Sequence, residues 1–160
     1  HVRSRRQRQM CIRDREKIKK NLIQANQESL KVGWFPESRY TSENDNLPVA
    51  QVAQWNEEGS INNPVRPFIR FGFMPKLSKA EYRKLFESSI ANVLQGKSTF
   101  KAEYAKLGPV LVKGLKQTIT DWNTPPNSPR TIEAKGFDDP LVWTGTMRET
   151  VEYKVERGSD

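Results

Sequence analysis

The sequence is poor in the side chains on which most enzymes and transition-metal sites depend. Its 160 residues include one histidine, His1, and one cysteine, Cys11. A single cysteine excludes an intrachain disulfide and a CxxC metal site. A histidine-based catalytic triad is excluded as well, because the one histidine is the first residue of the sequence. We therefore expect a protein that is not an enzyme and that holds no metal and no cofactor.

Two weaker signals for chemistry have a simpler structural interpretation. The adjacent carboxylates Asp138–Asp139 and Glu57–Glu58 could hold a hard cation, but neither pair has further ligands at a recognised spacing. Solvated loop carboxylates are favoured. Cys11 could be a reactive thiol among cations, but its spacing to Ile18 and Leu22 favours a packing position on a helix.

Long hydrophobic runs are also missing. Hydrophobic residues make up 35% of the chain, and no apolar run approaches the roughly 20 residues that span a bilayer. The arginines near the start are not followed by the apolar core of a signal peptide. We expect a soluble protein without a membrane partner, whose exposed polar segments meet other subunits.

What the sequence does have is an uneven distribution of charge. The net charge is +8, and residues 1–20 hold +7 of it, with nine Lys or Arg against Asp14 and Glu16. A basic arm of this kind meets phosphate backbones or acidic protein surfaces, or forms a solvated helix face. Docking or a solvated face is favoured over direct DNA contact, since charge runs often serve solubility or assembly. No aromatic side chains are interleaved with the charges, so base stacking on single strands is not expected. The candidate contacts to DNA or to an acidic partner are Arg3, Arg5, Arg6, Arg8, Arg13 and Arg15.

The first part of the chain is predicted to be mainly helical. Residues 4–30 lack Gly and Pro and carry a stripe at helical spacing, which predicts a long amphipathic helix. The residues of this stripe are Cys11, Ile18, Leu22, Ala25 and Ser29. A short strand is expected at 32–36, and a short helix at 48–58 with Asn46 as its cap.

The stretch FIRFGF, residues 68–73, has the period of a strand. Ile69, Phe71 and Phe73 alternate with smaller or polar neighbours, so they would lie on one side of a sheet. Gly72 would then permit a bulge or a close approach of another element.

The remaining chain is predicted to contain two helices, a loop and a strand. Residues 78–96 begin with the spacing of a capping box, and residues 99–122 carry a long apolar stripe that Gly108–Pro109 should kink or split. Three prolines in 123–131 indicate an extended surface loop. Strict alternation at 151–156 gives the clearest strand signal.

These elements predict an α+β fold. We expect a small, mainly antiparallel or mixed sheet packed with helices, together with the long N-terminal amphipathic helix. The predicted organisation is a basic arm at 1–30 followed by a single domain at 31–160.

Four segments, taken in order, resemble one family. They are VAQVAQWNEEGS (49–60), NPVRPFIR (63–70), DWNTPPNSPRTIEAKG (121–136) and PLVWTGTMRETVEYKV (140–155). This order is similar to the neck or tail-completion proteins of tailed bacteriophages, which are virion morphogenesis proteins of tail-terminator-like type. The matching positions are Asn56, Glu57, Gly59, Arg66, Pro67, Phe68, Arg70, Pro126, Asn127, Pro129, Thr131, Lys135, Gly136, Pro140, Leu141, Thr144, Gly145, Met147, Arg148 and Tyr153. The sequence departs from the family pattern at Glu58, Trp143 and Thr150.

The resemblance implies a structural virion protein of the head–tail junction. Such a subunit would form a homo-oligomeric ring, usually a hexamer, would contact portal or connector and tail-tube or terminator proteins, and could face DNA in the channel. It would be located in the virion, and in the host cytoplasm during assembly. The alternative is a nucleic-acid-binding module that uses the basic arm.

The resemblance also points to contact residues. The expected subunit or partner interface consists of Trp55, Glu57, Arg66, Phe68, Arg70, Asn127, Arg130, Trp143, Met147 and Arg148. Arg66 and Arg70 could make forked bonds to carboxylates across a subunit boundary. Pairing with Glu57 or Glu58 within the chain is an equal alternative.

Overall fold

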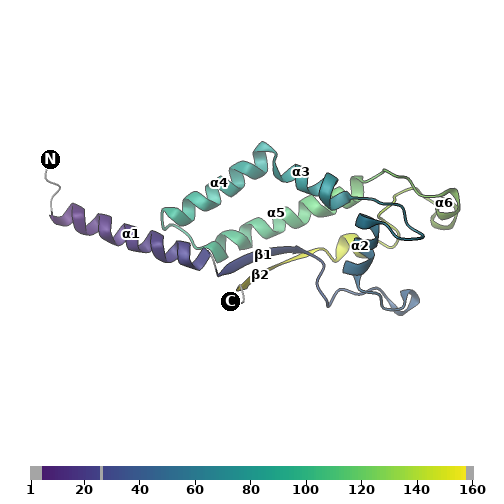
Figure 1. Ribbon diagram of the computed structural model, residues 1–160, viewed down its shortest axis with the longest axis horizontal. Helices are drawn as coiled ribbons and strands as arrows, with labels where there is room; N and C mark the ends of the chain where they lie inside the picture. The colour runs from purple at the N-terminus through teal and green to yellow at the C-terminus, as the bar shows by residue number, and fades with distance from the viewer. Residues whose placement is uncertain (1–4, 26, 158–160) are drawn as a thin grey trace. The chain divides into compact units, whose positions relative to one another are not determined.

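The computed structural model describes residues 5–25 and 27–157 (Figure 1). Its elements are α1 (Arg5–Ala25), β1 (Glu28–Gly33), the 3-10 turn η1 (Ser42–Asn44), α2 (Val49–Glu58), the π-helical η2 (Phe68–Phe73), α3 (Met74–Leu77), α4 (Ala80–Leu94), α5 (Phe100–Asp121), α6 (Pro129–Lys135), α7 (Thr146–Glu149) and β2 (Glu152–Arg157). β1 and β2 pair in a two-stranded antiparallel sheet. This combination confirms the predicted α+β fold class.

The described chain forms two compact units. Unit 1 contains the described residues up to Lys31, together with Ala80–Gly108 and the described residues from Lys154 onward. Unit 2 contains Val32–Lys79 and Pro109–Tyr153. The boundary on α5 falls between Gly108 and Pro109, where we predicted a kink or split; the helix itself is not split. The division into 1–30 and 31–160 stays a prediction.

Unit 1 is built around the contact between α1 and α4. Asn21 of α1 is buried, and its Nδ2 donates to the carbonyl of Val93 on α4 at 3.0 Å. Val93 and Leu107 form the apolar core of this unit.

The predicted stripe of the first helix is only partly right. Ile18 is half-buried, whereas Leu22 is exposed, because Asn21 is the residue that packs against α4. The helix ends at Ala25 rather than near residue 30, and Ser29 lies on β1. The side chains of Cys11 and Ala25 lie outside the described part of the structure.

Unit 2 contains most of the buried apolar side chains. They are Val49, Ala53, Phe68, Phe73, Leu111, Leu115, Ile119, Leu141, Met147 and Val151. α2 contacts both α7 and η2. As predicted, α2 covers 49–58 and ends before Gly59, whose φ of 83° favours glycine. Its N-terminal flanking residue is Pro48 rather than Asn46.

The predicted strand at 68–73 is wrong, because this stretch forms the π-helical turn η2. Phe68 and Phe73 are buried on it, while Phe71 is 68% exposed, so the expected alternation of faces is absent. Gly72 faces α5 so closely that a Cβ there would lie 2.6 Å from Thr118 Cγ2 and 3.0 Å from the Trp122 ring. The prediction of a close approach at Gly72 is thus right, although the partner is a helix.

Three boundaries also differ from the predictions. β1 begins at Glu28, before the expected strand at 32–36. The expected loop at 123–131 ends early, because α6 begins at Pro129 with Ser128 as its cap; Ser128 Oγ accepts a hydrogen bond from the Thr131 amide at 3.2 Å. α4 starts at Ala80, close to the predicted start, and β2 confirms the predicted strand near the C-terminus.

Candidate functional site

Arg66 is the centre of a hydrogen-bonded cluster in unit 2. The side chain is 5% exposed, and its Nε donates to the carbonyl of Pro125 at 3.1 Å. Its Nη2 donates to the carbonyl of Pro126 and to Asn127 Oδ1, both at 3.3 Å. Its Nη1 donates to Asn56 Oδ1 at 3.5 Å, and its main-chain amide donates to the Asn56 carbonyl at 2.6 Å.

These acceptors are all neutral, which distinguishes the cluster from a salt bridge. Of the two alternatives for Arg66, pairing with Glu57 or Glu58 within the chain is not what the structure shows. Burial lowers the pKa of Arg66, and the negative charge of Asp138 opposes that effect. A planar fork of donors suits several carbonyl oxygens at fixed angles, a task that lysine cannot reproduce.

Glu57 has a capping role on η2. Its Oε2 accepts from the Ile69 amide at 2.8 Å and its Oε1 accepts from the Arg70 amide at 2.9 Å. A carboxylate that accepts from two amides at the start of a helical turn satisfies donors that have no partner within that turn. The Glu57 carboxylate, on α2, thus fixes the course of the chain after Pro67.

Asn127 connects the proline-rich segment to the loop after α6. Its main-chain amide donates to Asp138 Oδ1 at 2.9 Å, and its side chain is 8% exposed. Asn127 Nδ2 is buried and has no hydrogen-bond partner among the described residues. Since Oδ1 already accepts from Arg66, exchanging the two amide atoms would lose that bond rather than repair the donor.

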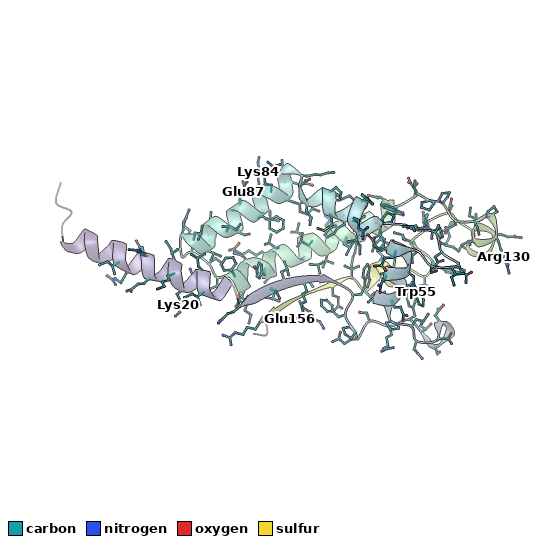
Figure 2. The ribbon with its side chains drawn as sticks, in the orientation of Figure 1. Lys20, Trp55, Lys84, Glu87, Arg130 and Glu156 are labelled. Carbon is teal, nitrogen blue, oxygen red and sulfur yellow. The ribbon has the colours of Figure 1, made fainter. Side chains whose placement is uncertain are left out.

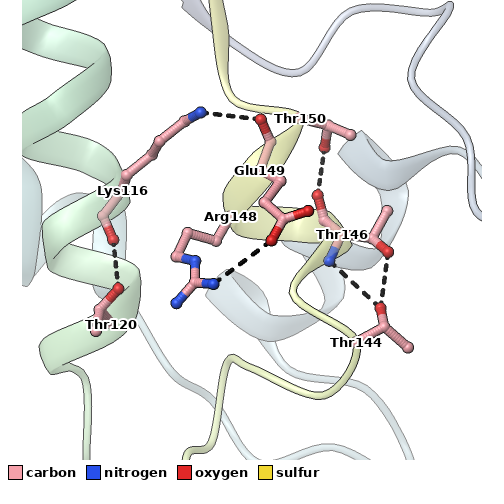
Figure 3. A network of polar contacts seen from close by, with 7 residues as sticks. All are labelled: Lys116, Thr120, Thr144, Thr146, Arg148, Glu149 and Thr150. Atoms are coloured by element: carbon pink, nitrogen blue, oxygen red, sulfur yellow. Dashed lines mark hydrogen bonds and ion pairs between the residues drawn. The ribbon is translucent and has the colours of Figure 1, made fainter.

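A polar network holds the turn around α7 (Figure 3). The Thr144 and Thr146 hydroxyls lie 2.7 Å apart, and Thr150 Oγ1 donates to the Thr146 carbonyl at 2.7 Å. From α5, Lys116 Nζ donates to the Glu149 carbonyl at 2.9 Å. Gly145 precedes the helix with a φ of 85°, which favours glycine.

Lys135 lies among aromatic rings at the end of α6. Its Nζ is 4.9 Å from the centre of the Phe137 ring and 5.8 Å from that of Trp143. It also donates to the carbonyl of Asp139. Burial is the main cause that lowers the pKa of Lys135; Asp139 opposes it, Arg66 adds to it and Asp138 opposes it.

A hollow of about 920 Å³ lies beside these groups, entirely within unit 2. Its lining includes Tyr40, Asn56, Arg66, Asn127, Lys135 and Trp143. Trp143 is 62% exposed, and Leu141 and Met147 add apolar surface. The hollow therefore combines two aromatic rings, amides and two cations.

The predicted interface residues all belong to unit 2 but differ in exposure. Arg66, Phe68, Asn127 and Met147 are buried, Trp55, Glu57 and Arg148 are half-buried, and Arg70, Arg130 and Trp143 are exposed. Figure 2 shows Trp55 on α2 and Arg130 on α6. The structure thus brings these residues into one unit, but the buried ones serve its interior. A role for the set in contacting partners stays a prediction.

The residues of the basic arm are described only in part. Arg3 lies outside the described residues, and for Arg5, Arg6 and Arg8 the structure describes the helical backbone of α1 but not the side chains. Arg13 and Arg15 are exposed on α1.

Two residues of these polar networks, one in the Arg66 cluster and one near α7, were not predicted to have a role there. Asp138 was expected to be a solvated carboxylate, yet it accepts from the Asn127 amide; no sequence signal marks this pair, since 11 positions separate them. Lys116 reaches Glu149 across 33 positions, again without a local signal.

Among the described residues, no group of three or more His, Cys, Asp or Glu could hold a metal ion. No helix in the described ranges is long and apolar enough to span a bilayer.

Comparison with known proteins identifies no relative: no family model, no curated protein and no solved structure matches the chain.

Proposed function

We propose that the chain is a structural subunit of the head–tail junction of a tailed bacteriophage, in the neck or tail-completion layer, and that it has no catalytic turnover. The observation that supports this proposal is the connection between the segments that carry the family resemblance. Arg66 of the second segment bonds to Asn56 of the first and to Pro126 and Asn127 of the third. α7, in the fourth segment, contacts α2, in the first.

This connection gives the motif residues a common physical task. Arg66, Glu57 and Asn127 hold four distant stretches of chain in a fixed arrangement, so no reactive group is required at these positions. Arg70, Arg130 and Trp143 remain exposed on that rigid scaffold and are the contacts that we propose for neighbouring subunits. Exposed arginine and tryptophan are typical anchors of protein interfaces.

In this proposal the subunits form a closed ring, with a hexamer as the expected size. Each subunit presents one surface to a different surface of the next, and such a heterologous interface closes only if the rotation per subunit divides a full turn. The ring would contact portal or connector proteins on one side and tail-tube or terminator proteins on the other. Its location would be the virion, after assembly in the host cytoplasm.

The decisive test is to locate the chain in particles. We expect gold label directed at a tagged chain to mark the junction of head and tail in electron micrographs, and native mass spectrometry of the purified chain to show a closed oligomer. A tagged copy that is absent from purified particles would refute the proposal. Label along the tail or on the capsid would refute the assignment to the junction.

A second candidate function, nucleic-acid binding, is favoured by the charges of α1. Arg13, Arg15, Lys17, Lys19 and Lys20 are all exposed there, and Figure 2 shows Lys20 on this helix. If α1 binds duplex DNA, the logarithm of the affinity should fall linearly with the logarithm of salt concentration. The double variant R13Q/R15Q should reduce that slope by about two. The variant K84Q/K101Q, which removes two exposed lysines elsewhere, should leave the slope unchanged, and equal effects would refute the α1 site.

A further inference from the structure

The hollow in unit 2 has an unbalanced charge. Arg66 and Lys135 both line it, whereas none of its described lining residues is Asp or Glu. Asp138 acts on both cations and Asp139 acts on Lys135, in each case from outside the lining. A concave surface with cations and no carboxylate attracts negatively charged groups, because low-dielectric walls focus the field.

Neither cation is neutralised by an ion pair among the described residues. Arg66 donates to two carbonyls and two side-chain amide oxygens, none of which carries a charge. Lys135 donates to the carbonyl of Asp139. No carboxylate within the described residues lies within 4.0 Å of either charged group. The positive charge that these two side chains bring to the hollow is therefore available to a partner.

Lys135 is also held in place. Its ammonium group lies over the Phe137 ring and near the Trp143 ring, and its bond to Asp139 fixes the direction of the side chain. A cation that is already positioned loses less side-chain entropy when it pairs with a ligand.

Asn127 supplies a second, independent observation. It lines the hollow, and its Nδ2 is a buried donor that no described residue satisfies. A buried donor without an acceptor destabilises the folded protein, because it has lost its hydrogen bonds to water. A small rotation of the side chain toward the hollow would let an acceptor in a bound partner remove that penalty.

We propose that this hollow binds an acidic peptide segment of a partner protein, whose side-chain carboxylate pairs with Lys135 while a main-chain carbonyl accepts from Asn127. The volume, about 920 Å³, is large enough for several residues. Peptide rather than nucleic acid is favoured because the lining is rich in amides, including Asn56, Asn62, Asn63 and Asn127, which match main-chain donors and acceptors. Two cations do not form the extended track that a phosphate backbone needs.

This inference rests on the proposed function only in expecting that the segment belongs to a neighbouring virion subunit. The charge and hydrogen-bonding arguments use unit 2 alone. Failure of the particle labelling would remove the virion role and leave the peptide site untouched, whereas failure of the binding experiment below would remove the site and leave the virion role.

The test is an NMR titration of the full isotope-labelled chain with two blocked tetrapeptides. The probes are acetyl-Ala-Glu-Glu-Ala-amide and its neutral counterpart acetyl-Ala-Gln-Gln-Ala-amide, at millimolar concentration. We expect the acidic peptide to shift the side-chain amide signals of Asn127 and the indole signal of Trp143, and the neutral peptide to bind at least about tenfold more weakly, as for the loss of a charge-assisted hydrogen bond.

Two variants with the same change of net charge separate the site from general attraction. K135M should reduce the affinity for the acidic peptide about tenfold, whereas K113M, at an exposed lysine of α5 outside the hollow, should not change it. Unchanged signals in the rest of unit 2 would show that K135M is folded. The proposal would be overturned if both peptides gave equal shifts or if both variants lost affinity equally. It would also be overturned if the acidic peptide gave no shift at Asn127, whether or not a DNA oligonucleotide gave one there.

Discussion

At the scale of single residues, one arginine joins three parts of unit 2. Arg66 joins α2, the segment before η2 and the proline-rich segment through oxygens that are all neutral. Its value lies in the geometry of the guanidinium group, because one planar fork reaches four acceptors. The exposed Arg70, four positions later in the same motif, makes a natural comparison.

We expect R66K to lower the free energy of unfolding of unit 2 by about 3 kcal/mol, since lysine keeps the charge but leaves buried oxygens without donors. R70K should change it by less than about 0.5 kcal/mol because that side chain is exposed. Urea unfolding followed by tryptophan fluorescence measures this difference. All four tryptophans, Trp34, Trp55, Trp122 and Trp143, belong to unit 2. Similar effects of the two variants would contradict the role assigned to Arg66.

Glu103 is the corresponding residue in unit 1. It is buried on α5, and Lys106 Nζ donates to its Oε1 at 2.8 Å. Burial alone would raise the pKa of Glu103, but hydrogen bonds from Lys106, Ser98 and Ser89 and the charge of Lys106 outweigh it, so the pKa is lowered. A lowered pKa in the folded state means that the carboxylate stabilises unit 1 above its ordinary pKa. That stability is lost as the pH falls through the folded-state pKa.

The variant E103Q should therefore have a pH-dependent effect. Near neutral pH we expect a loss of about 1–3 kcal/mol, because the amide accepts weaker hydrogen bonds and leaves Lys106 without its charge partner. The difference in the free energy of unfolding between the unchanged protein and E103Q should shrink as the pH falls below about 4.3, the ordinary pKa of a glutamate. Circular dichroism during urea unfolding at several pH values measures it, with E87Q at an exposed position of α4 as control. A difference that does not change with pH would contradict the ionic contribution.

At the scale of elements, the sequence predicted those parts whose signals are local. Gly59 marked the end of α2, and the alternation at 151–156 marked β2. The prediction failed at 68–73, where the alternating Ile69, Phe71 and Phe73 have the period of a strand. Two contacts with other elements stabilise the π-helical turn instead. Glu57 of α2 caps the turn, and α5 packs so closely that position 72 requires a glycine.

The helix α6 shows a different kind of failure. Ser128 and Pro129 carry the signal of a helix start, a capping serine before a proline, but three prolines together suggested a continuous loop. The Arg66 cluster was beyond prediction for another reason. We expected these residues to form a contact surface because of the family resemblance. Apart from its bonds with Asn56, however, the hydrogen bonds of Arg66 reach residues that are 59 to 61 positions away, and no local pattern marks such pairs.

The turn η2 should therefore depend on a residue outside it. We expect E57A to destabilise η2 by about 1–2 kcal/mol, as for the loss of a helix cap with two bonded amides. The measurable consequence is faster trypsin cleavage after Arg70, which is already exposed but held in a helical turn. E58A, which removes the neighbouring exposed carboxylate, should leave the cleavage rate unchanged. Equal acceleration in both variants would mean that general charge, not the cap, controls the turn.

At the scale of the whole molecule, the two units share α5 but divide at Gly108 and Pro109. Proline has no amide hydrogen, so the helix lacks one of its hydrogen bonds at this point. Each unit has its own buried polar centre, Glu103 in unit 1 and Arg66 in unit 2. This arrangement predicts that the units open separately rather than as one cooperative block.

Hydrogen exchange of the full chain, read by mass spectrometry, tests this separation. We expect E103Q to accelerate exchange in α4 and in residues 100–108 but not in α2 or α6, because its lost bonds all lie in unit 1. R66K should accelerate exchange in α2 and α6 and leave α4 unchanged, since its acceptors all lie in unit 2. On α5 the effect of E103Q should stop near Pro109. If either variant accelerated exchange equally in both units, α5 would transmit stability across its proline and the molecule would unfold as one.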